Sequence, residues 1–335
     1  ICAAAGGGVM EFGLRRAQGP DAGVYGARAA IIGGCVGTSN VYAGKLFQVP
    51  VSGTMAHSWV MNFPSELEAF RAYARSFPDN CLLLVDTYDT LRSGVPNAIR
   101  VFRELREQGF EPKGIRLDSG DLAYLSKKAR KMLDEAGFQD AIICASGDLD
   151  ETLIRSLKAQ GACIDTWGVG TKLITSADMP ALGGVYKLAA VYEDGSEIPK
   201  IKLSDTTEKI TNPGVKEVYR IYDAATDKAV ADYIVRAGEF VDETKPLTIF
   251  HPVDTWKRMT IEHFRLRDLR EDLFRGGQRV APVRSLSEIA EYRRREQSRF
   301  WEEYLRQDMP HIYKVDLSTE LYNLKQSLVE EFGSR

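Results

Sequence analysis

Acidic side chains follow two short apolar runs of the sequence, at the point where each run ends. Asp86 and Asp89 come after the first run, and Asp118 and Asp121 come after the second. Carboxylates gathered at neighbouring strand ends can hold Mg²⁺, bind ribose hydroxyls or stabilise a developing positive charge. Because unpaired carboxylates are costly to bury, an ion-pair network among them is the alternative. Asp86 and Asp121 are therefore candidate metal ligands.

A cation accompanies the second pair of carboxylates. Arg116 precedes Asp118 by two residues, so both side chains leave the same face of a strand. We take Arg116 and Asp118, with Asp86, as candidate catalytic residues.

Glycine turns follow two further apolar runs. Ser146-Gly147-Asp148 repeats the tripeptide of Ser119-Gly120-Asp121, and Gly168-Val169-Gly170 comes after the next run. Glycine permits a tight turn, and its exposed backbone N–H groups can face an anion. The alternative is a set of tight turns in which each Asp only caps the helix that follows. Gly147, Asp148, Gly168 and Gly170 are candidate phosphate ligands.

His57 is the only histidine in the first 250 residues. It lies in the motif Gly53–Ser58, after a predicted strand over Phe47–Val51, which would place it at another strand end. A lone histidine is more often structural, but here its imidazole could act as base, hydrogen-bond donor or phosphoryl acceptor.

Two more motifs could bind an anion. Glu11–Arg16 brings the adjacent cations Arg15 and Arg16 into a glycine-flanked segment, with a solvated pair as the alternative. Gly37–Asn40 precedes a predicted helix over Val41–Leu46, and it offers an N-cap and free N–H groups to a carboxylate.

The elements that must position these residues alternate between strands and helices. Each predicted strand is short and apolar, as expected when both of its faces are buried. The strands are predicted at Cys81–Val85, Gly114–Leu117, Ala141–Ala145 and Cys163–Trp167, and the helices at Leu91–Gln108, Leu122–Ala136 and Leu149–Gln160. This series predicts a parallel sheet, and the polar strand ends favour an irregular TIM-like α/β barrel.

The pattern changes near Gly184. Val185–Val191, Glu217–Tyr222 and Val230–Val235 predict antiparallel strands, and the capping box Ser285-x-x-Glu288 predicts a helix through Tyr304. Glutamates interleave with the arginines of that helix, which indicates a solvated, ion-paired surface. We predict an α/β barrel over residues 1–184 and a mixed α+β remainder of a second domain over 185–335.

Bulk composition excludes some partners. The 335 residues carry a net charge of −3, which gives no reason to expect nucleic acid or an anionic membrane. No apolar run approaches the roughly 20 residues of a membrane span, and no signal peptide is visible.

The five cysteines form no Cys-x-x-Cys pair and fit buried thiols in a reducing, cytoplasmic setting. The chain begins without Met, inside what looks like a structured segment, so we expect a piece of a longer protein.

Seven motifs together resemble the nicotinate phosphoribosyltransferase family, in the same order and over essentially the whole chain. They are Glu-Phe-Gly-Leu-Arg-Arg (11–16), Gly-Thr-Ser-Asn (37–40), Gly-Thr-Met-Ala-His-Ser (53–58), Val-Asp-Thr-Tyr-Asp (85–89), Ile-Arg-Leu-Asp-Ser-Gly-Asp (115–121), Ala-Ser-Gly-Asp-Leu (145–149) and Gly-Val-Gly-Thr-Lys (168–172).

The resemblance implies a type II phosphoribosyltransferase fold. It implies that nicotinate and 5-phosphoribosyl-1-pyrophosphate are the substrates, that Mg²⁺ is required, and that ATP hydrolysis is coupled through a phosphohistidine. It also implies a homodimer with a shared active site, in NAD biosynthesis. The family also has an N-terminal segment that supplies an aromatic residue and part of the dimer interface, and from the resemblance we expect this chain to lack it.

By motif match, His57 is the phosphohistidine and Asp86 an acid beside it. Arg15, Arg116 and Asp118 match residues that line the base and ribose site. Substrate-binding candidates lie in the remaining motifs: Thr38, Ser39, Ser58, Gly147, Asp148, Gly168 and Gly170.

Three alternatives remain open. The nicotinamide-specific relative carries an Asp where this chain has Ser39, and a neutral Ser suits a carboxylate better. A barrel lyase or aldolase would need a buried lysine at a strand end, and none stands out. A chain without the N-terminal segment could also be an inactive fragment that only binds.

Overall fold

The computed structural model describes residues 1–333, apart from the side chain of residue 208. The chain divides into two compact units. The first comprises residues 1–182 and 284–293, and the second comprises 183–283 and 294–335.

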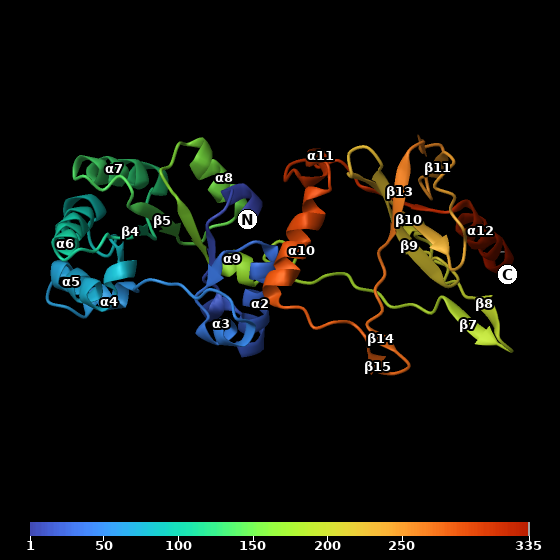
Figure 1. Ribbon diagram of the computed structural model, residues 1–335, viewed down its shortest axis with the longest axis horizontal. Coiled ribbons are helices and arrows are strands. Elements are labelled where there is room, and N and C mark those ends of the chain that lie inside the picture. The colour runs from blue at the N-terminus through green and yellow to red at the C-terminus, as the bar shows by residue number, and fades with distance from the viewer. Residues whose placement is uncertain (334–335) are drawn as a thin grey trace. The chain divides into compact units, whose positions relative to one another are not determined.

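A six-stranded sheet forms the centre of the first unit (Figure 1). Its strand order is β2-β1-β6-β5-β4-β3, and every neighbouring pair is parallel. The strands are β1 (Val9–Glu11), β2 (Gly37–Thr38), β3 (Leu82–Leu84), β4 (Gly114–Leu117), β5 (Ile142–Ser146) and β6 (Thr166–Val169). Because parallel strands need crossover connections, helices separate them along the chain.

The helices begin where side chains cap them. Asn40, Ser65, Asp121 and Asp150 each accept a hydrogen bond from the backbone N–H three residues later. The helices of this unit are α1 (Cys2–Ala5), α2 (Pro20–Gly33), α3 (Val41–Phe47), α4 (His57–Met61), α5 (Glu66–Ser76), α6 (Val95–Glu107), α7 (Leu122–Glu135), α8 (Glu151–Ala159) and α9 (Thr171–Ile174), with α10 (Leu286–Ser298) running on into the second unit. Short 3-10 turns η1 (Leu14–Arg16) and η2 (Pro78–Asn80) and a π-helical turn η3 (Thr90–Gly94) complete it.

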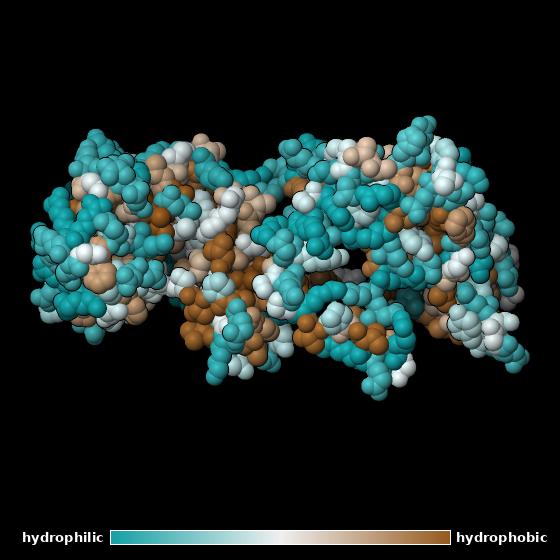
Figure 2. Space-filling view, in the orientation of Figure 1, coloured by the Kyte–Doolittle hydropathy of each residue, from teal (hydrophilic) through white to brown (hydrophobic). Residues whose placement is uncertain are grey.

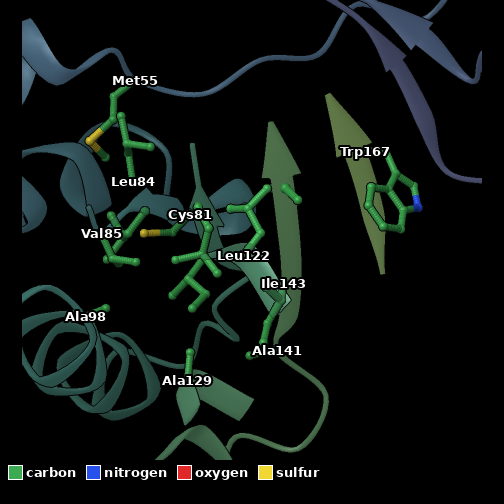
Figure 3. Packing of buried hydrophobic residues seen from close by; sticks show 14 of the residues in the cluster. Met55, Cys81, Leu84, Val85, Ala98, Leu122, Ala129, Ala141, Ile143 and Trp167 are labelled. Carbon is green, nitrogen blue, oxygen red and sulfur yellow. The ribbon is translucent and has the colours of Figure 1, made fainter. Parts of the chain in front are cut away.

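Apolar burial holds this unit together. Ile115 and Ile143 of the sheet are fully buried, as is Phe102 of α6. Each such side chain contributes roughly 1.5–3 kcal/mol when it leaves water. Figure 3 shows part of this core, including Ile143 of β5 with Ala98 of α6 and Ala129 of α7. The outward side of α5, α6 and α7 is mostly hydrophilic (Figure 2), as expected of helices that bury one face.

The second unit is mainly β. Its largest sheet has the order β13-β9-β10-β16, antiparallel except for the β10–β16 pair. Its strands are β7 (Ala190–Glu193), β8 (Ser196–Pro199), β9 (Lys216–Asp223), β10 (Ala229–Arg236), β11 (Leu247–Phe250), β12 (Arg258–Ile261), β13 (Phe264–Asp268), β14 (Phe274–Arg275), β15 (Gln278–Arg279) and β16 (Lys314–Leu317). A 3-10 turn η4 (Thr207–Lys209) and helices α11 (Glu302–Leu305) and α12 (Thr319–Gly333) accompany them.

The predicted fold class is confirmed: a mixed α/β unit with a parallel sheet precedes a mainly β unit. β2 and β3 are the two ends of the six-stranded sheet, and no pairing joins them within residues 1–333. Closure into a barrel therefore stays a prediction. Within the same residues, no helix is both long enough and apolar enough to cross a membrane.

Some predicted elements are wrong in extent. Phe47 ends α3, and of the predicted strand Phe47–Val51 only Val51 pairs, in a single bridge with Thr38. His57 consequently begins α4 and does not follow a strand. Of Val185–Val191, only the last two residues are in a strand. Phe47 is the last residue of α3, and its C-cap Gln48 has a φ of 56°, so the chain is not extended at the start of the predicted strand Phe47–Val51.

The helix predicted through Tyr304 ends at Ser298, although the capping box opens it as expected. Lys228 Nζ donates to the Ser298 carbonyl, and Ala229 N of β10 donates to the Arg299 carbonyl. The carbonyl groups of Ser298 and Arg299 therefore accept hydrogen bonds from outside the helix, where α10 ends. The next helix, α11, begins at Glu302.

We predict that Gly94→Ala destabilises the protein. A Cβ on Gly94 would lie 1.8 Å from the Val85 carbonyl oxygen at the end of β3, so the backbone must shift. We expect a loss of about 1–3 kcal/mol in the free energy of unfolding, as in other overpacked sites, measured by urea denaturation. Gly33→Ala is the matched control, because its Cβ would meet no atom within 4 Å. Equal stability of the two variants would contradict the prediction.

Candidate active site

A pocket of about 450 Å³ lies in the first unit, where the carboxyl ends of several strands meet. It gathers most of the residues that the sequence singled out. Its lining comprises Phe12, Arg15, Arg16, Ser39, Gly53, Thr54, Met55, Ala56, His57, Leu84, Arg116, Asp118, Ser146, Gly147, Asp148, Gly168, Gly170 and Thr171.

Arg116 occupies the centre of the polar network. Its Nη2 lies 2.6 Å from Asp118 Oδ1, and its Nε donates to Ser146 Oγ at 2.7 Å. Its Nη1 donates to Thr54 Oγ1 at 3.0 Å. The guanidinium carbon also lies 5.7 Å from the centre of the Phe12 ring. One planar cation thus connects β4, β5 and the segment before His57.

Asp118 is held as a carboxylate by this network. Burial is the largest influence and raises the pKa of Asp118, but the Ser146 hydrogen bond and the charge and hydrogen bond of Arg116 together lower it below its ordinary value. Ser146 Oγ lies 2.5 Å from Asp118 Oδ1. The i and i+2 positions of Arg116 and Asp118 do share a face, as the strand period predicts.

His57 and Asp86 form a second pair at the rim. His57 Nε2 lies 3.1 Å from Asp86 Oδ1, and Asp86 Oδ2 accepts from the Asp118 backbone N at 2.8 Å and from Ser119 Oγ at 2.7 Å. The Asp86 side chain is only 2% exposed, whereas that of His57 is 38% exposed. Because a carboxylate only accepts, Nε2–H donates, and Nδ1 is the nitrogen left to react.

The glycine loops follow β5 and β6. Gly147 has a φ of 94°, and a Cβ there would lie 2.1 Å from the Asp118 carbonyl oxygen. A Cβ on Gly168 would lie 2.5 Å from the Phe12 ring. Glycine is required at Gly147, because its φ is positive and a Cβ would meet backbone, whereas a Cβ at Gly168 would force the Phe12 ring to move.

Asp148 does not cap α8, contrary to the capping alternative. Its φ is 39°, and the helix begins three residues later, at Glu151, with Asp150 as its N-cap. The Asp148 side chain is exposed at the pocket instead. Asp121, by contrast, does cap α7, since its Oδ1 accepts from Tyr124 N at 2.9 Å.

Four sequence candidates do not line the pocket. Thr38 is buried, Ser58 is exposed outside the lining, and Asp121 caps α7. Asp86 lies behind the lining and contacts two residues of it, His57 and Asp118. Among the side chains that the structure describes, no group of three or more His, Cys, Asp and Glu residues could hold a metal ion. A metal role for Asp86 and Asp121 stays a prediction.

Sequence reasoning missed several lining residues. Ser146, Thr54 and Phe12 lie inside the motifs but were assigned no role of their own. The signal for Ser146 was present, because the side chain before a glycine turn at a strand end must face the same edge as the strand-end carboxylates. Nothing in the spacing could place Thr54, which lies 62 positions from Arg116.

Comparisons with known proteins agree on one family. The chain matches the Nicotinate phosphoribosyltransferase (NAPRTase) family over residues 8–225 and the Nicotinate phosphoribosyltransferase C-terminal domain over 215–325. It is 52% identical to a nicotinate phosphoribosyltransferase of Bacillus subtilis over 97% of this chain and 66% of that protein. It is 38% identical to one of Dictyostelium discoideum, over 96% of this chain and 62% of that protein. The chain thus spans slightly less than two thirds of the length of these relatives.

The fold is also similar to a solved structure. The crystal structure of human nicotinic acid phosphoribosyltransferase superposes with a TM-score of 0.79 at 30% sequence identity, covering 98% of this chain and 72% of that one.

We predict that Asp118 stabilises the folded protein at neutral pH and that this stabilisation decreases as the pH is lowered. Because the pKa of Asp118 is lowered in the folded state, its contribution is fully present above the ordinary value near pH 4 and is lost as the pH falls below that value and through the lowered folded-state pKa. Asp118→Asn should therefore cost about 1–2 kcal/mol of unfolding free energy at pH 7 and less at pH 3.5, measured by urea denaturation. Ser146→Ala should change stability in the same direction, with the exposed Ser76→Ala as control. A cost that did not depend on pH would contradict the prediction.

Proposed function

The chain belongs to the nicotinate phosphoribosyltransferase family, and we propose that it forms nicotinate mononucleotide and pyrophosphate from nicotinate and 5-phosphoribosyl-1-pyrophosphate. The observation that carries the proposal is one pocket in which two glycine loops, the Arg116–Asp118 pair and His57 face the same space. The pocket thus offers groups suited to binding the phosphate, the ribose and the base of the two substrates.

In this proposal the glycine loops position the substrate. The N–H groups around Gly147, Gly168 and Gly170 hold the 5′-phosphate, which does not react. The nicotinate nitrogen then attacks C1 of the ribose while the bond to pyrophosphate breaks. Asp118 and Asp148, which line the pocket, stabilise the positive charge that develops on the ribose.

Nicotinate lies, in this proposal, beside Arg15, Ser39 and the Phe12 ring. Arg15 supplies a cation for its carboxylate, and the neutral Ser39 adds no repulsion. Mg²⁺, when bound, neutralises the pyrophosphate. With the donor set described above, Mg²⁺ would be held mainly by substrate oxygens, as is common for this ion.

ATP hydrolysis is the finer part of the proposal. Asp86 orients His57 through Nε2, which leaves Nδ1 as the phosphoryl acceptor. The phosphorylated imidazole would add negative charge at the rim of the pocket, within reach of a cationic neighbourhood that includes Arg116. The ligase-type classification, the cytoplasmic location and a homodimer with a shared site belong to this same proposal.

We predict that Gly147→Ala impairs use of 5-phosphoribosyl-1-pyrophosphate. Its Cβ would collide with the Asp118 carbonyl and displace both the loop and Asp118. We expect KM for this substrate to rise at least about ten-fold in steady-state assays, which corresponds to the loss of one good phosphate contact. Gly161→Ala is the matched control, because Gly161 also has a positive φ, 72°, but its Cβ would meet nothing within 4 Å. Absence of nicotinate turnover by the wild-type protein would instead contradict the proposed function.

We predict that His57→Ala loses ATP hydrolysis and ATP stimulation together. The variant lacks the phosphoryl acceptor, but Arg116, Asp118 and the glycine loops are untouched, so some ATP-independent transfer should survive. Measuring ADP and nicotinate mononucleotide in the same reaction separates the two activities. ATP hydrolysis that still kept step with product formation would refute the phosphohistidine, and His311→Ala in the second unit controls for loss of a histidine.

A further inference from the structure

Glu11 is a buried acidic residue that the reaction scheme above does not use. It is the last residue of β1, its exposure is 0%, and it does not line the pocket. Burying a carboxyl group is costly unless hydrogen bonds compensate it, so its partners indicate its role.

The two carboxyl oxygens of Glu11 bind two different loops. Oε1 accepts from the backbone N of Gly13, which is the N-cap of η1. Oε2 accepts from Thr38 Oγ1 at 2.5 Å. Thr38 lies directly opposite Glu11 in the β1–β2 pair.

Each of these loops carries a residue of the proposed nicotinate site. Arg15 belongs to η1, and Ser39 follows Thr38; both line the pocket. The Ser39 backbone N also donates to the Glu11 carbonyl at 2.9 Å, and Thr38 Oγ1 accepts from Asn40 N at 3.0 Å. Glu11 therefore contacts the Ser39 loop through its side chain and its backbone, and the Arg15 loop through its side chain.

We propose that Glu11 is a positioning residue that sets the spacing between Arg15 and Ser39 and thereby determines the affinity for nicotinate. This inference rests on the proposed function, because it takes the space between Arg15 and Ser39 as the nicotinate site. It assigns no role to the Glu11 side chain in binding 5-phosphoribosyl-1-pyrophosphate, since its two carboxyl oxygens bind Gly13 and Thr38 and neither binds the loops around Gly147 and Gly168.

Two isosteric variants test the inference. Glu11→Gln retains the volume but cannot accept on both sides, and Thr38→Val removes the hydroxyl that links Glu11 to the Ser39 loop. Each should raise KM for nicotinate by roughly five- to ten-fold, the effect of one lost buried hydrogen bond, while kcat and KM for 5-phosphoribosyl-1-pyrophosphate change less than about two-fold. Thr38→Ser, which keeps the hydroxyl, should be less affected than Thr38→Val. The double variant should be no worse than the more impaired single variant, because both changes break one linkage.

Glu66→Gln is the matched control. Glu66 is also buried, at 5% exposure, and accepts from Asn97 Nδ2 at 2.9 Å, but it does not line the pocket. Its variant should leave KM for nicotinate unchanged. An unchanged KM for nicotinate in both Glu11→Gln and Thr38→Val, or an equal rise in both KM values, would overturn the positioning role. Absence of wild-type turnover would instead overturn the proposed function, so the two failures are distinguishable.

Discussion

The parallel pairing of β1, β6, β5 and β4 is the constraint on which the pocket depends. Parallel strands end at one edge of a sheet, so the residues that follow each strand are brought together irrespective of their distance in sequence. The register places Arg116 beside Cys144, and Ser146 beside Gly168. A shift of one residue in either pair would turn these side chains to the opposite face.

Charge at this edge is organised by a single cation. Arg116 has a side-chain exposure of 16% and donates to an acid and two hydroxyls. Without it, Asp118 would be a partly buried carboxylate with burial as the dominant influence, and its pKa would rise. The ion-pair alternative is thus confirmed for Arg116 and Asp118, and this ion pair is compatible with the proposed function, because it keeps Asp118 charged.

A second carboxyl group, that of Glu11, also connects separate segments of the chain, but it does not line the pocket. Its partners are neutral donors, so its stabilisation comes from hydrogen bonds and not from an opposite charge. Asp86 is similar in kind, since its oxygens bind His57, Ser119 and the Asp118 backbone. The pocket is therefore lined by one set of polar groups and supported by a second set, the carboxyl groups of Glu11 and Asp86, which hydrogen-bond its loops.

The sequence by itself determined the strand–helix alternation, the helix caps at Asn40 and Asp121, and the motifs that supply His57, Arg116 and the glycine loops. These features depend on local periodicity and on backbone preferences that neighbouring residues set. Only the tertiary structure decided that Phe47 belongs to α3, that α10 ends at Ser298, and that Thr54 and Ser146 contact Arg116. Those outcomes depend on partners distant in the chain, such as Lys228 for the end of α10, and no local pattern of residues records which distant groups will meet.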